Sequence, residues 1–459
     1  NVRFIDSAVT YHDWSYKMDH ILFRGTEEQF NTMIAEMEIE IDQHFNYNTI
    51  HFNCTAEAPI LTNTKRAAAN CLQKSKIYYS CCECGENICT MGGAYGEHIL
   101  GEDGNCVMCA FPTTETNKYF TFAEVLNEDG SEVIGYNITD CDTTVKGALL
   151  VPGEYKGLPV KGITDGALAG CKDVKSIIIG EGVETIGKRA FWHCDSLEAL
   201  TIPTTLLSID DDPFWGTEEN FSDVYISDLQ FWCEIDFSDI GVANPLGEAE
   251  NLYHNGILVE DLVLLGDVTE VKDTAFYDCE SIKSVTFSDK IEHIGKYAFN
   301  GCPNLTEVNI PDVPVQIDIH AFENTPIYDD ANNWENGAFY IDNHLINFLG
   351  EADEFVVRDG TVDIAKRAFA RTNYSGDKII KKLVLPDSLV KISDEAFQDS
   401  AYLEEITFGT GLKSIGEYAF ENCSLITSLD FKSLEEVGDY AFRGVDNVKT
   451  LHIPYNLGE

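Results

Sequence analysis

Four cysteines in the amino-terminal part of the chain form two closely spaced pairs. Two residues separate Cys81 from Cys84, two separate Cys106 from Cys109, and 21 residues lie between the pairs. Two residues between thiolates let one tight turn present both sulfurs to a single ion, and this spacing of pairs is typical of a zinc ribbon. We therefore predict a zinc site with these four ligands. Four thiolates close the coordination shell, so the predicted zinc is structural rather than catalytic.

Disulfides are an alternative for the same residues. Eight of the 15 cysteines lie between residues 51 and 112, and Cys82 and Cys89 offer further partners. Thiols pair in oxidising surroundings, whereas a metal would replace the core that a segment with few apolar runs lacks. Zinc, disulfides and unpaired thiols stay open at this point. His98 is interpreted as a surface residue or a neighbour of the ligands rather than as a ligand.

A repeated apolar pattern must build the rest of the chain. The pattern Ile-Gly-x-x-Ala-Phe-x-x-Cys surrounds Phe191, Phe299 and Phe420, and most neighbouring copies are 23 residues apart. Such a period is typical of a leucine-rich-repeat solenoid, in which stacked turns share the core that no single turn can bury. Weaker copies centre on Leu168, Phe214, Phe276, Phe322, Phe369, Phe397 and Phe442.

One turn shows how the pattern divides into elements. Residues 305–310 alternate apolar and polar side chains, which predicts a short half-buried strand that ends before Pro311. The corresponding strands of successive turns should form a parallel ladder. Phe299 should stack along the core with its counterparts. Gly295 is predicted to occupy a turn with unusual backbone angles.

Cysteines also occupy one phase of the repeat. We interpret them as buried free thiols that act as small apolar plugs. Disulfides between turns are the rival interpretation, but a bridge needs a geometry that a regular column need not offer. These cysteines are Cys171, Cys194, Cys279, Cys302 and Cys423, and Thr325, Thr372, Ser400 and Val445 fill the same phase elsewhere.

The repeat, followed by x-Leu-x-x-Val/Ile-x-Ile-Pro, resembles the BspA-like leucine-rich repeats of bacterial and some protozoan surface proteins over about residues 119–459. The resemblance implies a repeat solenoid with a curved parallel β-sheet, short turns and few short helices. It also implies a secreted or cell-surface, adhesin-like protein. Ribbon-like inserts with Gly-x-His before Cys-x-x-Cys, here residues 96–98, accompany such arrays. No ligand is implied, because these scaffolds hold different partners.

The charge of the chain excludes several classes of partner. The 31 basic and 78 acidic residues give a net charge of −47, which argues against nucleic acid and anionic membranes. The charge suits solubility of a long surface, basic proteins or divalent cations. No apolar run is long enough to span a bilayer, so no direct membrane insertion is predicted. The chain begins at Asn1, and we expect that any export signal has been removed.

Four parts are expected along the chain. Residues 1–50 are interpreted as a strand and helix segment at the tail of an earlier array, because residues 20–30 share a strand-then-helix pattern with residues 224–231. Residues 51–115 form the cysteine-rich module. Residues 119–162 form the amino-terminal cap that a solenoid needs. Residues 163–459 form the array, with inserts near 215–265 and 326–350 and a degenerate turn near Leu345.

Aromatic residues in the two inserts are the candidate ligand contacts: Trp215, Trp232, Trp334 and Tyr340. Inserts in solenoids often emerge on the binding face, where such rings stack on sugars or anchor proteins. The alternative is that they fill a locally disrupted core.

No catalytic motif accompanies these aromatic residues, because the nucleophile elbow, the H-E-x-x-H helix and the phosphate loop are all missing from the sequence. We predict a non-enzymatic extracellular protein that binds a host protein or glycan. An envelope scaffold without a ligand is the alternative. A cleft with two carboxylates beside Trp215 or Trp334 would instead favour a glycosidase. The oligomeric state is not predicted.

Overall fold

The structure is a computed structural model that describes residues 2–3, 21–22, 61–67, 74–81, 87–95, 116–217, 220–238, 243–350, 352–370 and 380–453. The chain divides into two units, residues 1–115 and 116–459. In the first unit, β1 (Val2–Arg3) and β2 (Ile21–Leu22) pair in parallel, and β3 (Leu61–Ala67), β4 (Lys74–Cys81) and β5 (Asn87–Tyr95) form an antiparallel sheet.

The predicted zinc site cannot be traced in this unit. Cys81 is the last residue of β4, where its backbone pairs with Leu61. The other three predicted ligands, Cys84, Cys106 and Cys109, lie outside the described residues, as does the helix predicted after residue 22. Zinc, disulfides and free thiols therefore remain predictions for this module.

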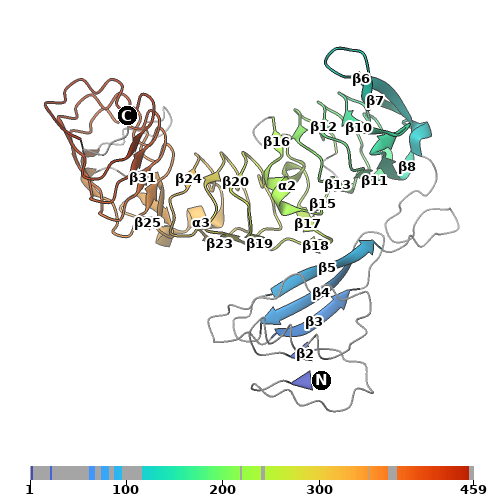
Figure 1. Ribbon diagram of the computed structural model, residues 1–459, viewed down its shortest axis with the longest axis horizontal. Coiled ribbons are helices and arrows are strands. Elements are labelled where there is room, and N and C mark those ends of the chain that lie inside the picture. The colour runs from blue at the N-terminus through green and yellow to red at the C-terminus, as the bar shows by residue number, and fades with distance from the viewer. Residues whose placement is uncertain are drawn as a thin grey trace. The chain divides into compact units, whose positions relative to one another are not determined.

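The second unit is a leucine-rich-repeat solenoid, which confirms the predicted fold (Figure 1). Each regular turn crosses two parallel strand rows. In the turn that contains Phe299, β22 (His293–Ile294) belongs to one row and β23 (Glu307–Asn309) to the other. The corresponding strands of the turns on either side pair with β22 in parallel, and that of the preceding turn pairs with β23. Pro311 follows the second strand, as predicted.

The row predicted from the alternating pattern contains the longer strands. In the described residues it consists of β8 (Lys146–Val151), β11 (Asp173–Ile179), β13 (Ala199–Thr201), β15 (Asp223–Ile226), β17 (Asn251–His254), β19 (Asp261–Leu264), β21 (Ser284–Phe287), β23, β28 (Ala352–Val356), β30 (Ile380–Val384), β32 (Glu405–Thr407), β34 (Ser428–Asp430) and β36 (Thr450–His452).

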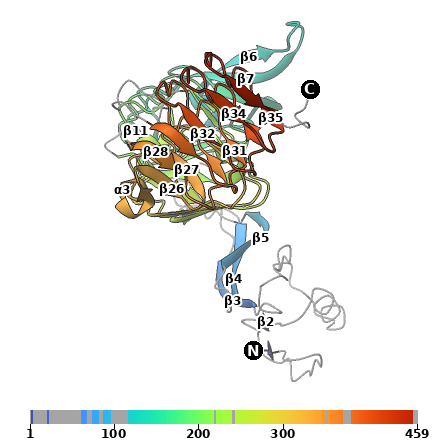
Figure 2. The same ribbon diagram turned by 90° about the vertical axis from the view of Figure 1, so that its left-hand side faces the viewer.

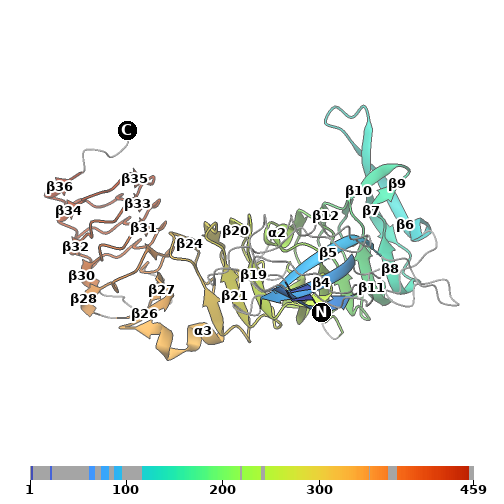
Figure 3. The same cartoon turned by 60° about the horizontal axis from the view of Figure 1, so that its bottom comes forward.

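The second row was not predicted, because most of its strands have two residues and therefore show no alternation. Figure 3 shows the two rows side by side in the carboxy-terminal turns, and Figure 2 looks onto the same turns from their end. The row consists of β10 (Leu158–Ile163), β12 (Thr185–Ile186), β14 (Ser208–Ile209), β16 (Asp236–Phe237), β20 (Glu270–Val271), β22, β24 (Gln316–Ile317), β27 (His344–Phe348), β29 (Asp363–Ile364), β31 (Lys391–Ile392), β33 (Ser414–Ile415) and β35 (Glu436–Val437).

Phenylalanine rings stack along the core between the two rows. Phe299 is fully buried, and its ring centroid lies 5.1 Å from that of Phe276 and 5.5 Å from that of Phe322. Another stack begins at Phe348, 4.9 Å from Phe369. The degenerate turn predicted near Leu345 is therefore present: Leu345 pairs with Ile364 in the second row, and Phe348 takes the stacking position.

The role predicted for Gly295 is wrong. Its φ is not positive, and the positive φ of this turn, 58°, belongs to Tyr297. A glycine is required instead because the turns approach closely: a Cβ at residue 295 would lie 2.6 Å from the backbone nitrogen and the Oδ1 atom of Asp273 in the preceding turn. That aspartate accepts a hydrogen bond from the amide of Lys296 at 2.7 Å, so the glycine makes room for a link between turns.

The repeat-phase cysteines are buried free thiols, as predicted. Three of them donate to a carbonyl oxygen of the preceding turn: Cys302 to Phe276 at 3.0 Å, Cys423 to Phe397 at 3.1 Å and Cys194 to Leu168 at 3.4 Å. Ser400 donates to Phe369 at 3.2 Å in the same way. The position therefore takes a small side chain, and at Ser400 a hydroxyl replaces the thiol as the donor to the preceding turn. Thr325 donates instead to the carbonyl of Phe322 in its own turn.

The predicted cap residues form two antiparallel hairpins, which follow η1 (Thr116–Tyr119). β6 (Phe120–Leu126) pairs with β7 (Val133–Cys141), and β9 (Glu154–Tyr155) pairs with β10. β7 also pairs with β10 in parallel and so covers the edge of the first turn. The rings of Phe122 and Tyr155 stack at 3.8 Å and join the two hairpins.

Both strand rows break together at two places, which divide the solenoid into three blocks; the row of longer strands also breaks between β32 and β34, where the second row is continuous. The first block ends with β18 (Ile257–Leu258), which folds back on β17, and the second block begins with β19. The third block begins with β25 (Trp334–Glu335) and β26 (Ala338–Ile341), after α3 (Pro326–Asp329) and η3 (Ala331–Asn333). We call these breaks the first and second junctions. In the residues that the structure describes, no strand pairing crosses either.

Uncharged groups hold the first junction together. The helix α2 (Leu229–Cys233) carries Trp232 into the core, where its indole donates to the carbonyl of Ala275 at 2.8 Å. Asn244, just before η2 (Pro245–Gly247), is fully buried, and its amide donates to the carbonyls of Thr274 at 2.6 Å and Ala275 at 3.0 Å. Two side chains thus replace the missing strand ladder.

Ion pairs connect neighbouring turns along the outer surface. Lys161 reaches Glu184 at 2.7 Å, Lys188 reaches Asp211 at 3.1 Å, and Lys283 contacts Glu260. The partners are 23 residues apart, so the period that stacks the core also places opposite charges side by side. These pairs are partly exposed and contribute little to stability.

Candidate functional site

Two of the four tryptophans whose side chains the structure describes form an exposed pair. Trp192 and Trp215 occupy the same phase of adjacent turns, and 37% and 52% of their surfaces are exposed. Their ring centroids lie 6.2 Å apart, with an angle of 25° between the ring planes. We call these two residues the tryptophan pair. Together they present a large rigid aromatic surface to solvent.

The core beneath fixes this pair. Each tryptophan follows a stacking phenylalanine, Phe191 or Phe214, and these two buried rings lie 5.3 Å apart. The amide of Phe191 donates to the carbonyl of Pro213 at 2.9 Å, and the amide of His193 donates to the carbonyl of Trp215 at 3.1 Å. Because both phenylalanines point inward, the following residues point outward on a backbone held from both sides.

Charged groups surround the tryptophan pair. The guanidinium of Arg189 lies over the Trp215 ring, 5.1 Å from its centroid, and 4.0 Å from the carboxylate of Asp212. His193 lies 3.4 Å from the carboxylate of Asp195. An aromatic centre with an arginine and a polar rim is the composition of binding hot spots in protein interfaces.

The four aromatic residues predicted as ligand contacts have different fates. Trp215 is exposed and belongs to the pair. The prediction is wrong for Trp232 and Tyr340, which are only 1% and 5% exposed because they fill the core at the junctions. Trp334 is half-buried; its indole donates to the carbonyl of Tyr328 at 2.6 Å. Trp192 was missed, although its distance of 23 residues from Trp215 could have identified it.

A polar groove of about 580 Å³ lies over the second strand row of the first block. It contains the carboxylates of Asp165, Asp210 and Asp236. Asp165 accepts from the amide of Lys188 at 3.0 Å, and Asp210 accepts from the amide of Asp211 at 2.9 Å. These two carboxylates thus bind backbone amides, which is a structural task. Among the side chains described, no cluster of three or more His, Cys, Asp and Glu residues is placed to hold a metal ion.

Within the described part of the chain, helices are too short and too polar for any of them to cross a lipid bilayer.

Comparison with known proteins gives one family match. The model of the BspA type leucine rich repeat region matches in six copies, over residues 158–232, 249–375 and 364–459. No curated protein matches the chain.

Several solved structures are similar to parts of this chain. A leucine rich cell surface protein from Faecalibacterium prausnitzii is 20% identical, covers 73% of this chain and 88% of its own, and has a TM-score of 0.29. A leucine-rich repeat protein from Bacteroides ovatus is 21% identical, covers 74% and 88%, and has a TM-score of 0.31. The leucine rich repeat protein of T. pallidum is 24% identical, covers 44% and 84%, and has a TM-score of 0.29.

Proposed function

The chain belongs to the BspA-type leucine-rich-repeat family, and on that premise we propose that it is a secreted or cell-surface binding protein that contacts its partner through the tryptophan pair. The partner is a host extracellular protein or glycan. One observation carries this proposal: Trp192 and Trp215 stand exposed and nearly parallel on a rigid solenoid. Large aromatic side chains at the surface of a soluble protein mark interaction sites.

A protein partner fits the pair better than a glycan. Arg189 covers part of the Trp215 ring, and the two indoles are stacked with 6.2 Å between their centroids, so less ring face is free for a sugar. Tryptophan and arginine are common anchors between proteins. The net charge of −47 favours a basic partner by electrostatic steering.

An envelope scaffold without a specific ligand is the second candidate. It is favoured by the ion pairs between turns, such as Lys161 with Glu184. The lysines of these pairs bind carboxylates within the array rather than a partner. An enzyme has less support, since the carboxylates of Asp165 and Asp210 bind backbone amides. Zinc binding by Cys81, Cys84, Cys106 and Cys109 stays a separate proposal, which metal analysis of the purified full chain would test.

The test is a binding screen of the full chain against extracellular matrix proteins and a glycan panel, at low and high salt. For a hit that survives high salt, the double variant Trp192→Ala/Trp215→Ala should bind at least about tenfold more weakly. Tyr440→Ala is the matched control, because Tyr440 is 58% exposed, stacks on Tyr418 and lies below Arg443 in another part of the array.

The outcomes separate the candidates. Equal binding by the double tryptophan variant would refute the tryptophan pair as the contact. Binding lost at high salt would show that the negative charge alone attracts basic surfaces. The absence of any hit would favour the scaffold. Antibody labelling of intact cells that express the protein would test its location.

A further inference from the structure

A buried ion pair joins two turns beside the second junction. His344 in β27 and Asp363 in β29 have fully buried side chains, and the Nδ1 atom of His344 lies 2.8 Å from the Oδ2 atom of Asp363. The two residues sit on neighbouring strands of the third block, where His344 and Asp363 are register partners. A charged pair without solvent is costly unless its members satisfy each other.

The pair also reaches across the junction. The Nε2 atom of His344 lies 3.0 Å from the carbonyl oxygen of Pro311, and the Oδ2 atom of Asp363 accepts from the amide of Val315 at 2.7 Å. Residues 311–315 belong to the second block, where they connect β23 to β24. His344 and Asp363, from two strands of the third block, therefore each bind one backbone group of residues 311–315 in the second block.

The geometry fixes the protonation of His344. One nitrogen faces a carboxylate oxygen and the other a carbonyl oxygen, and both kinds of oxygen only accept hydrogen bonds. With Asp363 ionised, each nitrogen therefore donates a hydrogen bond, and the ring is an imidazolium cation. The Oδ1 atom of Asp363 is buried without a partner, so this cation is the main compensation for the carboxylate charge.

The charged surroundings favour the cation. Besides Asp363, Asp342 in the turn between β26 and β27 adds a negative potential. Asp312 also lies within residues 311–315, whereas Lys391 of β31, the register partner of Asp363, carries a positive charge that opposes the cation. Burial lowers the pKa of His344, but Asp363, with help from Pro311 and Asp342, outweighs it and raises the pKa above its ordinary value of 6.5.

We propose that His344 is a proton-dependent clamp between the second and third blocks. The imidazolium holds residues 311–315 against β27 and β29. Loss of one proton removes a hydrogen bond to Pro311 or Asp363 and leaves the Asp363 carboxylate buried without a counter-ion. The segment then detaches more readily from the third block. This inference does not depend on the proposed binding function.

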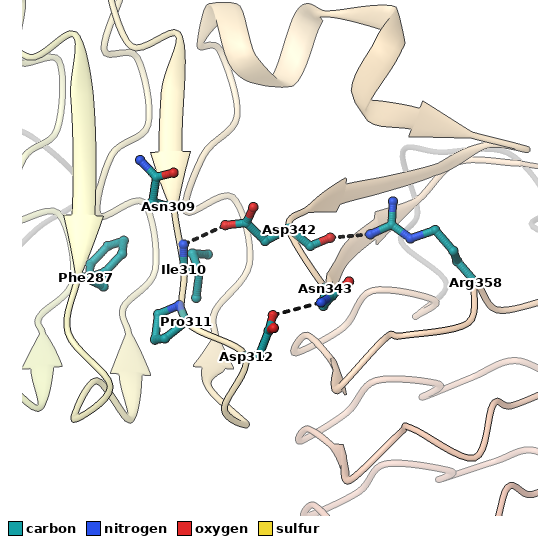
Figure 4. Close-up of a pocket in the computed structure, with 8 residues that line it drawn as sticks. All are labelled: Phe287, Asn309, Ile310, Pro311, Asp312, Asp342, Asn343 and Arg358. Atoms are coloured by element: carbon teal, nitrogen blue, oxygen red, sulfur yellow. Dashed lines mark hydrogen bonds between the residues drawn. The ribbon is translucent and has the colours of Figure 1, made fainter. Parts of the chain in front are cut away.

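A cleft of about 630 Å³ adjoins the clamp (Figure 4). Pro311, whose carbonyl binds His344, is part of its wall. Two further bonds cross the cleft: the amide of Ile310 donates to Asp342 at 2.8 Å, and the side chain of Asn343 donates to Asp312 at 2.8 Å. Release of residues 311–315 should strain these bonds and widen the cleft.

The sign of the pH dependence follows from the raised pKa. The stabilisation is complete below the unfolded pKa of 6.5 and is lost as the pH rises through the higher folded pKa. Amide hydrogen exchange of the wild-type chain between pH 6 and 9, corrected for intrinsic rates, measures this locally. Protection of residues 311–317, including the Val315 amide, should fall by up to about tenfold per pH unit above 6.5.

The first junction is the internal control. The amide of Lys272 donates to the carbonyl of Cys233 at 3.0 Å across this junction, where the linking side chains of Trp232 and Asn244 do not titrate, so its corrected protection should stay constant over the same range. The variant Asp363→Asn keeps an acceptor for Val315 but removes the charge, and it should abolish the pH dependence of residues 311–317. His452→Gln, which alters an exposed histidine of β36, should leave it unchanged.

Two outcomes would overturn the clamp. One is equal corrected protection of residues 311–317 and of Lys272 at every pH in the wild-type chain. The other is an Asp363→Asn variant that keeps the wild-type pH dependence. If that variant does not fold, the comparison of the two junctions within the wild-type chain still decides between clamp and passive packing.

Discussion

The two junctions meet the same structural need with different chemistry. At each of them the strand ladders stop, and buried side chains bind backbone groups of the adjoining block. The first junction uses the indole of Trp232 and the amide of Asn244, whereas the second uses His344 and Asp363. The linking groups differ in whether they can change charge. Indoles and amides do not titrate near neutral pH, but an imidazolium does. The contacts across the first junction should therefore be independent of pH, whereas those across the second should depend on it.

The largest expected effect is at the first junction. Trp232→Ala removes a side chain that is 1% exposed, together with its bond to Ala275. We expect it to lower the free energy of unfolding by about 3–5 kcal/mol, equally at pH 6 and pH 9. Urea unfolding at the two pH values measures this, with Trp215→Ala as the exposed control. A loss that differs between the two pH values would erase the distinction between the junctions.

Asp363→Asn should come next. At pH 6 it leaves the His344 imidazolium without its counter-ion, and we expect a loss of about 2–3 kcal/mol in the free energy of unfolding. The loss should shrink toward pH 9, because the wild-type chain gives up the same stabilisation as His344 loses its proton. Unfolding curves at several pH values test the trend, and a loss that grows with pH would contradict the assignment of an imidazolium.

Asn244→Ala should have a smaller effect. The change leaves the carbonyl of Thr274 without this donor, while the carbonyl of Ala275 keeps the indole of Trp232. We expect a loss of about 1–2 kcal/mol, independent of pH. Combined with Trp232→Ala it should be non-additive, because both side chains bind Ala275. Simple additivity in a double-mutant cycle would mean that the two contacts act separately.

The smallest effect is expected for an ion pair on the outer surface. Lys283→Met removes the partner of Glu260, and both side chains are about half exposed. We expect little measurable change in stability, and raising the salt concentration should not alter that result. A large loss would show that exposed pairs between turns stabilise the array as the buried pair does.

The periodic parts of this fold could be predicted from the sequence. Phe299 and its counterparts recur at 23 residues, and the spacing determines that they stack. The buried thiols followed from the same phase. The second strand row could not be predicted, since two residues such as His293 and Ile294 carry no alternation. The role predicted for Gly295 was wrong because a close approach between two turns cannot be recognised in the sequence of one turn.

The junctions lie beyond what a period can predict. Trp232 and Tyr340 stand where the repeat fails, and only the structure shows that both fill the core. His344 belongs to no motif and meets Asp363 and Pro311 from 19 and 33 residues away. Only one member of the tryptophan pair was predicted. Trp215 was a candidate because it lies at the start of an insert, whereas Trp192 lies within a regular turn.

The buried thiols have a consequence for the making of the protein. Burial raises the pKa of Cys279 to about 11, and oxidants attack the thiolate of an accessible cysteine. Burial also raises the pKa of Cys302 and Cys423, so once folded these three thiols should tolerate oxidising surroundings without forming disulfides. The nascent chain has no such protection, because every repeat cysteine is then accessible and reactive. Folding therefore competes with oxidation during synthesis. Each turn that folds buries its thiol and protects it from oxidants.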